Sequence, residues 1–162
     1  MRRVEADLHN HTTFSDGTLT PAELVAWGRE CHLRALAVTD HDTIAGCAEA
    51  LAEGRRLGID VLAGIEVTLR FTRPFFTGSL HLLLYFDQEL LSDAAFLSDL
   101  TTVVAAGRGP GLFKRRIQAI NDYFGPSAPE PVLRRPLTFE EVQSLASNLT
   151  RRHIVTALTQ FH

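Results

Sequence analysis

The sequence predicts an α/β fold, because segments typical of strands and of helices alternate along its first half. Residues 4–8 alternate between apolar and polar side chains, and Ala35 to Thr39 is a continuous apolar run. Both patterns are typical of strands, the second of a buried one. An amphipathic segment that opens at Pro21 lies between them. Strands and helices that alternate at short spacing form βαβ units, so we expect a parallel sheet.

The first two helices carry recognisable end signals. Thr20 and Glu23 form a capping box in front of a helix expected over residues 21–31, whose first residue is proline. A second helix is expected over residues 43–57, and Gly58 stands where a C-cap glycine belongs. These signals place one helix after each of the first two strands.

Two more strands are predicted before the chain becomes helical. They cover residues 61–67 and 80–86, and we expect the bulky RFTRPFFTG segment between them to form a loop over the site. Beyond Asp87 we expect helices over residues 90–106, 112–124, 138–147 and 152–160, with a break at 107–111. The organisation predicted is an N-terminal sheet region, residues 1–88, followed by a helical region, residues 89–162.

Length and composition narrow the class of protein. The chain has 162 residues, of which 45% are hydrophobic, enough for one domain with a core. It contains no apolar stretch of 18 residues and no secretory signal at its N-terminus, so we expect no contact with a membrane. Cys31 and Cys47 are too few for a disulfide framework, which favours a reducing, cytoplasmic location.

The charge is unevenly distributed. Residues 1–100 hold 15 acidic and 8 basic residues, and residues 101–162 hold 4 acidic and 8 basic residues, so the two parts carry formal charges of -7 and +4. One interpretation is two solvated faces of opposite sign. The other is a carboxylate-rich metal site facing basic groups that meet an anionic substrate.

Histidines and carboxylates follow successive predicted strands. The i, i+2 spacing of His9 and His11 directs both imidazoles to one side of the chain, and Asp7 shares that parity. The later strands add the rest of the set, namely Asp40, His41 and Asp42 in TDHD, Glu66 in GIEVT and His81 in SLHLLLYF. The C-terminal ends of parallel strands meet at one edge, which is where α/β folds build their sites.

A bound cation explains this pattern better than burial does. Unpaired polar groups at buried positions cost roughly 2–7 kcal/mol each, whereas imidazole and carboxylate together suit Zn²⁺, Mn²⁺ or Fe²⁺. Asp40 could instead cap the following helix, and Asp7 could hold a ligand imidazole in one tautomer. We expect His32 and His162 to be surface or helix-end residues without a role.

The segments DLHNHTTFSDGTLTPAELV, ALAVTDHDTIAG, GIDVLAGIEVT and SLHLLLYF together resemble the PHP (polymerase and histidinol phosphatase) family. The resemblance covers residues 4 to about 86 closely. A looser similarity continues in FKRRIQAINDYFG, LTFEEVQSLA and RRHIVTALTQ, which resemble the helical insert of small PHP phosphoesterases acting on nucleotides and short RNA. The resemblance to the PHP family implies a distorted (β/α)7 TIM-like barrel with a site for two or three metal ions. It also implies that this chain contains only part of the barrel, with the C-terminal strands missing.

The resemblance also implies roles for individual residues. Carried over by position, the metal ligands would be His9, His11, Asp16, His41, Glu66 and His81. It implies that His153 faces the substrate phosphate, assisted by Arg152 or Arg151, and that His41, Asp16 and His153 serve catalysis. A contribution from Lys114, Arg115 and Arg116 is a weaker expectation, because a solvated helix face explains them as well.

The activity expected from the resemblance is hydrolysis of a phosphate ester of a nucleotide or short oligonucleotide by a metal-activated water. The alternative is a truncated, non-catalytic PHP module that binds metal incompletely, because this chain stops at His162 and a (β/α) barrel typically needs about 250 residues. Such a module would expose a sheet edge and self-associate. A polymerase-associated module is less favoured, since those domains head much longer chains. Binding to duplex nucleic acid is not expected from a net charge of -3.

Overall fold

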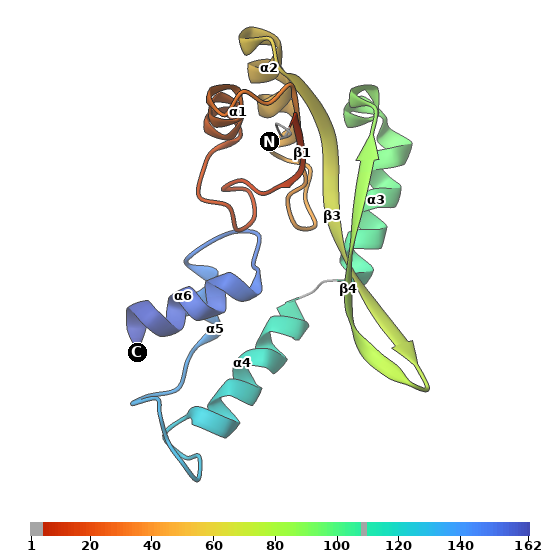
Figure 1. The fold of residues 1–162 in the computed structure, drawn as a ribbon. Helices are drawn as coiled ribbons and strands as arrows, with labels where there is room; N and C mark the ends of the chain where they lie inside the picture. Colours follow the sequence, from red (N-terminus) through yellow and green to blue (C-terminus); the bar gives the residue numbers. More distant parts are fainter. Residues whose placement is uncertain (1–4, 108–109) are drawn as a thin grey trace. The chain divides into compact units, whose positions relative to one another are not determined.

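The structure is a computed structural model that describes residues 5–107 and 110–162. Contacts divide the chain into two compact units, Met1–Gly107 and Arg108–His162, and each is described by itself. Figure 1 shows the strands in the first unit, and the described part of the second unit contains helices and loops. None of the helices in the described part of the chain is long and apolar enough to span a bilayer.

Within the described residues, the first unit holds one sheet of four strands in the order β1-β2-β3-β4. These strands are β1 (Ala6–Asn10), β2 (Ala35–Val38), β3 (Asp60–Arg73) and β4 (Phe76–Phe86). β1 pairs with β2 and β2 with β3 in parallel, as the alternation of strands and helices predicted. The mixed α/β class is therefore confirmed, and the sheet is curled like half of a barrel.

The fourth strand differs from expectation, because β3 and β4 form an antiparallel hairpin (Figure 1). The prediction that RFTRPFFTG is a loop over the site was wrong, since β3 continues to Arg73 and pairs with Phe76 across the turn. Residues 67–73 alternate between apolar and polar types, which is the pattern of a half-covered antiparallel strand. The hairpin register sets Thr68 opposite His81.

Helix α1 (Pro21–Glu30) begins with the predicted capping box, since the Thr20 side chain accepts from Glu23 N and the Glu23 carboxylate accepts from Thr20 N. Helix α2 (Cys47–Leu57) ends at Gly58, which adopts φ 66°, as its position predicted. Its start was predicted four residues too early. Residues 43 and 44 are irregular and residues 45 and 46 form a turn, after Asp42 has left the sheet edge with φ 52°.

The core of the first unit lies between the sheet and the helices α1 and α2. Leu36 and Val38 of β2 are each 1% exposed and pack with Val25 of α1 and Ala50 of α2. β2 is buried on both faces, since Ala37 between them is 0% exposed. This core fixes the strand ends on which the polar residues stand.

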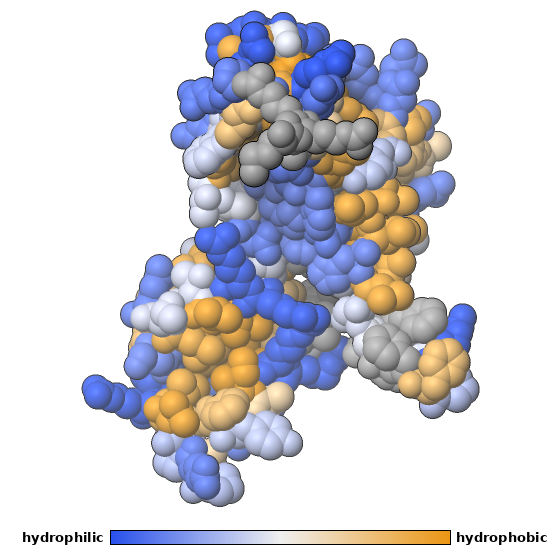
Figure 2. Space-filling view, in the orientation of Figure 1, coloured by the Kyte–Doolittle hydropathy of each residue, from blue (hydrophilic) through white to orange (hydrophobic). Residues whose placement is uncertain are grey.

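The expected helix over residues 90–106 is divided into a short 3-10 helix η1 (Gln88–Ser92) and α3 (Ala94–Gly107). The Asp93 carboxylate accepts from Phe96 N at 2.8 Å, so it satisfies a donor at the start of α3. α3 lies along β3 and β4 in Figure 1, and Phe96 packs against Phe86 with ring centroids 5.0 Å apart. Figure 2 shows hydrophobic atoms over β4 and α3, where Leu80, Leu82, Leu84 and Val103 are between 39% and 46% exposed.

The second unit comprises α4 (Pro110–Phe124), α5 (Phe139–Gln143) and α6 (Arg151–Phe161) within its described residues. α4 and α6 agree closely with the predicted helices, whereas part of the expected break at 107–111 lies outside the described residues. α5 has its predicted Thr138–Glu141 capping box but ends at Gln143 instead of residue 147. Ser144 follows, and its hydroxyl donates to Glu141 O, a local bond typical of helix ends.

The core of the second unit is apolar, and the amide side chain of Asn121 hydrogen-bonds to the backbone of one core residue. Its members are Phe113, Ile117, Leu137, Val142, Ile154 and Ala157. Asn121 of α4 brackets Leu137, because its side-chain nitrogen donates to Leu137 O at 2.9 Å and its oxygen accepts from Leu137 N at 2.8 Å. These two bonds satisfy the main-chain N–H and C=O of the buried Leu137, near the end of the long connection before α5.

Candidate metal centre

The polar residues predicted at the strand ends come together in the first unit. His9 lies in β1, and His11 follows directly after that strand. His41 follows β2 and forms an isolated parallel bridge with Glu66 of β3, and His81 comes from β4. Four neighbouring strands therefore present imidazoles and a carboxylate at one place, as their spacing predicted.

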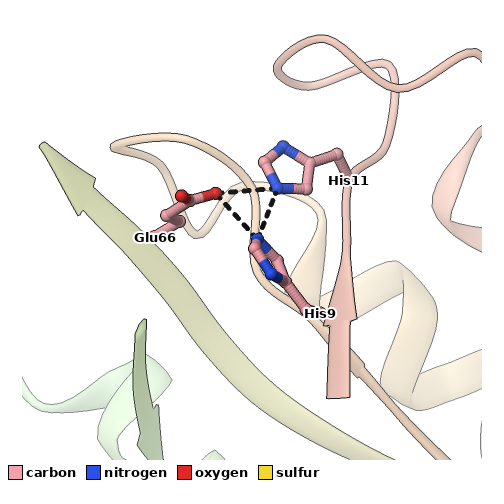
Figure 3. Close-up of side chains that lie close together, drawn as sticks. All are labelled: His9, His11 and Glu66. Atoms are coloured by element: carbon pink, nitrogen blue, oxygen red, sulfur yellow. Dashed lines mark hydrogen bonds and ion pairs between the residues drawn. The ribbon is translucent and has the colours of Figure 1, made fainter. Parts of the chain in front are cut away.

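The carboxylate of Glu66 is the common partner of this cluster. Its Oε2 lies 3.0 Å from His9 Nε2 and 2.8 Å from His11 Nε2, and Figure 3 shows the three side chains converging. Its other oxygen, Oε1, lies 2.8 Å from His81 Nδ1. The Glu66 side chain is only 7% exposed, so these contacts replace most of its hydration.

Asp16 extends the cluster on the side of His11 and His41. Its Oδ1 lies 2.9 Å from His11 Nδ1, and its Oδ2 lies 3.6 Å from His41 Nε2. His41 Nδ1 in turn lies 3.5 Å from Glu66 Oε2. The ring centroid of His41 is 4.5 Å from that of His11 and 4.9 Å from that of His81. Two carboxylates are thus interleaved with four imidazoles.

The cluster divides into three overlapping groups that could each hold a metal ion. They are His9–His11–Glu66, His11–Asp16–His41 and His41–Glu66–His81, and within each group the ligand atoms lie within 4.8 Å of one another. Donors bound tetrahedrally to Zn²⁺ at about 2.0–2.1 Å stand about 3.3 Å apart. The contacts of 2.8–3.6 Å within the cluster lie around this separation, so the residues fit a cation after adjustments of a few tenths of an ångström.

The electrostatics also suit a cation. Burial lowers the pKa of His41, against the opposing influence of Glu66 and Asp16, and so favours the neutral imidazole that binds metals. Burial by itself raises the pKa of Glu66. The hydrogen bond with His9 and the nearby charges of His41 and His11 together outweigh it, and the pKa is held below its ordinary value. A neutral imidazole beside an ionised carboxylate is the protonation state of metal ligands.

Asp40 and Asp7 stand beside the cluster without joining its groups. The Asp40 side chain is fully buried and accepts hydrogen bonds from Thr12 and Ser15, so its carboxylate meets the loop after β1 instead of the helix that follows it. Asp7 accepts from the backbone N–H of His9 at 3.3 Å. It therefore contacts the main chain of His9, and the alternative that it holds a ligand imidazole stays a prediction.

Of three further buried residues near the cluster, Thr12 and Ser15 were missed by the sequence analysis, and Asp42 was named there without a role. Asp42 accepts from Thr68 N at 2.6 Å and from Thr68 Oγ1 at 2.8 Å, which ties the loop after His41 to β3. Thr12 and Ser15 are 0% and 2% exposed and hold the loop that carries Asp16. No local sequence signal identifies these contacts, because the partners of Asp40 and Asp42 lie on other segments of the chain.

The histidines given no role are found in different environments. His32 is exposed and adopts φ 62° after α1, as a helix-end residue does. His162 is also a helix-end residue, as expected, but its side chain is only 2% exposed and its Nε2 lies 3.7 Å from Glu141 Oε2. It caps the end of α6, where its backbone N–H donates to Leu158 O.

Arg152 and His153, expected at the substrate phosphate, belong to the first turn of α6 in the second unit. His153 Nδ1 accepts from Thr150 N at 2.9 Å and so takes part in a cap of that helix. Arg151 and Arg152 are exposed. Two of the basic residues of α4 contact aromatic rings, Lys114 that of Phe139 at 5.3 Å and Arg116 that of Phe113 at 5.4 Å. The substrate roles of Arg152 and His153 remain predictions.

Solved structures share this fold. A Bifidobacterium adolescentis protein described as a candidate metal-dependent phosphoesterase matches with a TM-score of 0.69 and 29% identity, over 94% of this chain and 49% of that one. An amidohydrolase from Chromobacterium violaceum, solved with bound sulfate, matches with a TM-score of 0.68 and 26% identity, over 96% and 49%. This chain thus spans about half the length of both structures.

Curated relatives match over a shorter region. The chain is 47% identical over 64 residues to the 5'-3' exoribonuclease Rnm of Escherichia coli, which is 38% of this chain and 22% of that protein. It is 45% identical over 67 residues to the 3',5'-nucleoside bisphosphate phosphatase of Chromobacterium violaceum, which is 41% and 24%. A 5'-3' exoribonuclease of Haemophilus influenzae is 45% identical over 62 residues, 38% and 23%. The match covers less than a quarter of each relative.

The family assignment rests on a longer stretch of the chain. The model of the PHP domain matches residues 7–127, which include every residue of the histidine and carboxylate cluster. The expectation drawn from the HNH and TDHD segments is thereby confirmed. This chain belongs to the PHP domain family.

Proposed function

We propose that the protein is a metal-dependent phosphoesterase that hydrolyses phosphate esters of nucleotides or short oligonucleotides. The observation that carries this proposal is the position of the Glu66 carboxylate within 3.0 Å of His9 and His11, with its other oxygen 2.8 Å from His81. A carboxylate shared among imidazoles is the donor set that holds neighbouring divalent cations. Within a PHP domain, such a centre serves phosphoester chemistry.

The residues that would hold the metal are the six members of the cluster, His9, His11, Asp16, His41, Glu66 and His81. We propose two or three ions of Mn, Zn or Fe, since the three overlapping groups offer that many positions. Bound divalent cations supply a water of lowered pKa and stabilise the charge that develops on the phosphate oxygens.

The protein's own contribution is to fix the cluster and to handle charge and protons. The carboxylates of Glu66 and Asp16 lie 2.8 and 2.9 Å from Nε2 and Nδ1 of His11 and so fix the orientation of its ring. We propose that Arg152 supplies positive charge to the phosphate and that His153 contacts it and gives a proton to the leaving oxygen, because imidazole titrates near neutral pH. These two roles follow from the family resemblance of the RRHI stretch.

The substrate class is supported by the relatives and by the charge of the chain. The similar proteins are named as exoribonucleases and as a nucleoside bisphosphate phosphatase, all of which act on phosphate groups of nucleotides. The basic residues of the second unit would attract such anions. The two free cysteines, exposed Cys31 and buried Cys47, accord with the reducing, cytoplasmic location that we propose.

The test measures release of inorganic phosphate from the purified chain. We expect Mn²⁺-dependent release from nucleoside 3',5'-bisphosphates or from 5'-phosphorylated short RNA, and no release by His41→Ala. Arg29→Ala is a matched control, because Arg29 lies on the exposed surface of α1 away from the cluster. Activity that equals that of His41→Ala would overturn the proposal. Metal binding without hydrolysis would instead support the alternative, a non-catalytic metal-binding module.

We also propose that the chain self-associates through the outer face of β4. Among the described strands β4 is an edge of the sheet, and its residues Leu80, Leu82 and Leu84 are 39–46% exposed. An apolar, unpaired edge strand favours pairing with another chain. Sedimentation at increasing protein concentration tests this, and a monomer at every concentration would contradict it.

A further inference from the structure

The carboxylate of Asp40 is buried beside the metal cluster without belonging to it. It is 0% exposed, and three donors of the preceding loop point at it. Oδ1 accepts from Thr12 N at 2.7 Å and from Ser15 Oγ at 2.5 Å, and Oδ2 accepts from Thr12 Oγ1 at 2.6 Å. Hydrogen bonds to a carboxylate are among the stronger ones in proteins, and here no competing water reaches them.

The three donors belong to one tight loop that carries Asp16. The loop is closed by Ser15 N and Gly17 N, which both donate to Thr12 O, at 3.0 and 2.9 Å. Asp16 stands between the two closing residues. Its carboxylate reaches out of the loop to His11 Nδ1 at 2.9 Å and to His41 Nε2 at 3.6 Å.

Asp40 therefore links two parts of the centre that lie far apart in sequence. It immediately precedes His41, and the backbone N–H of Glu66 donates to its carbonyl oxygen at 3.1 Å. The side chain of Asp40 holds the Asp16 loop while its main chain is paired to β3. Asp40 thus joins the loop that carries Asp16 to the strand end that carries His41, and its surroundings are tight, since a Cβ on Gly46 would lie 3.1 Å from Asp40 Oδ2.

We propose that Asp40 is a positioning residue, which holds the loop of residues 12–17 so that Asp16 meets His11 and His41, and which thereby sets the cation affinity of that one group. This inference rests on the proposed metal-binding function. It assigns Asp40 no metal contact, and it predicts an effect confined to the group that contains Asp16. Partners that orient ligands typically change metal affinity about 10–100-fold when they are removed.

The experiment is a double-mutant cycle read by Mn²⁺ and Zn²⁺ titration of the full chain. We expect Asp40→Asn to weaken binding about 10–100-fold. We expect the Asp40→Asn/Asp16→Asn double variant to bind no more weakly than Asp16→Asn alone, because the first substitution acts through Asp16. Losses that simply add in this pair, or unchanged binding by Asp40→Asn, would overturn the proposal.

Asp42→Asn is the matched control, because Asp42 is also a buried aspartate beside His41 but accepts from Thr68 of β3. Its effect on metal affinity should add to that of Asp16→Asn. Coupling of Asp42 to Asp16 as strong as that of Asp40 would contradict a specific role for Asp40, because a general loss of packing would produce it.

A second readout needs no metal. Amide hydrogen exchange of the metal-free Asp40→Asn variant should be faster at residues 12–17 than in wild type and unchanged in α2.

If wild type binds neither cation, the proposed function fails. Unchanged hydrogen exchange at residues 12–17 would separately overturn the inference about Asp40. If Asp40→Asn does not fold, Ser15→Ala, which removes the 2.5 Å hydrogen bond to Asp40 Oδ1 together with a longer contact of 3.5 Å to His11 Nδ1, should show the same coupling to Asp16 at smaller size. Additive losses in that pair would overturn the proposal as well.

Discussion

Replacement of Gly17 by alanine should damage the metal centre through backbone geometry alone. A Cβ at Gly17 would press on the carbonyl group of His11 and lie 2.6 Å from Thr12 N. Both obstacles are main-chain atoms, so no side chain can rotate away. Because non-bonded heavy atoms are normally about 3.5–4.0 Å apart, the loop must open by roughly 1 Å.

An opening of this size is large compared with the contacts that the loop maintains. Asp16, the residue before Gly17, holds His11 at 2.9 Å, and a hydrogen bond of this type is lost beyond about 3.2 Å. Overpacking typically costs about 1–3 kcal/mol, which corresponds to a fall in the melting temperature of about 2–12 °C for a chain of this length. Misplacement of a site by 1 Å can reduce activity about 100-fold.

The assay combines thermal unfolding with Mn²⁺ titration, and Gly58→Ala is the matched control. Gly58 adopts φ 66° and a Cβ there would meet nothing within 4 Å, so that substitution should cost about 1–2 kcal/mol without changing metal affinity. We expect Gly17→Ala to weaken binding at least tenfold more than the control does. Equal metal affinity in the two variants would refute the argument that the loop backbone places Asp16.

Four further outcomes are expected. Glu66→Gln should weaken metal binding about 100- to 1000-fold by titration, because it replaces the charged carboxylate shared by two of the three groups with a neutral amide; unchanged binding would count against the shared-ligand role. A chelator should lower the melting temperature of metal-loaded protein and leave Glu66→Gln unaffected, since bound ligand stabilises by about 2.7 kcal/mol at 100 times its Kd. The side-chain hydrogen bond from Arg135 is the main cause that lowers the pKa of Glu141 from 4.5 to about 2. The ionised Glu141 carboxylate should therefore stabilise the fold fully above pH 4.5, and this stabilisation should disappear as the pH falls toward 2. Acid unfolding of Glu141→Gln should lack this pH-dependent loss of stability. Leu36→Ala should cost about 2–5 kcal/mol in urea unfolding, because this side chain is 1% exposed, and a loss below 1 kcal/mol would contradict its place in the core.

The convergence of His9, His11, His41 and Glu66 was predictable because two simple rules apply to these residues. The i, i+2 spacing puts His9 and His11 on one side of the chain, and parallel neighbours place His41 and Glu66 at the same edge. The capping box at Thr20 and the left-handed Gly58 likewise depend on local chemistry alone. Features of this kind depend either on interactions between residues close in sequence or on the alternation of side chains between the two faces of a strand.

Features that depend on distant partners could not be read in the same way. Nothing in the TDHD motif indicates that Asp40 meets Ser15 and that Asp42 meets Thr68, since both partners lie on other segments. The burial of His162 likewise depends on packing within the second unit. The extension of β3 to Arg73 had a local signal in the alternation of residues 67–73, but Pro74 and the aromatic residues beside it favoured a loop instead.

The central claim is that imidazoles and carboxylates on four strands form a metal centre, and elemental analysis tests it most directly. Purified protein dialysed against Mn²⁺ or Zn²⁺ should retain at least one ion per chain, and a variant with His11→Ala, His41→Ala and Glu66→Gln should retain none. Far-ultraviolet circular dichroism would verify that both proteins are folded. Wild type that retains no ion, or a folded triple variant that retains as much metal as wild type, would contradict the account.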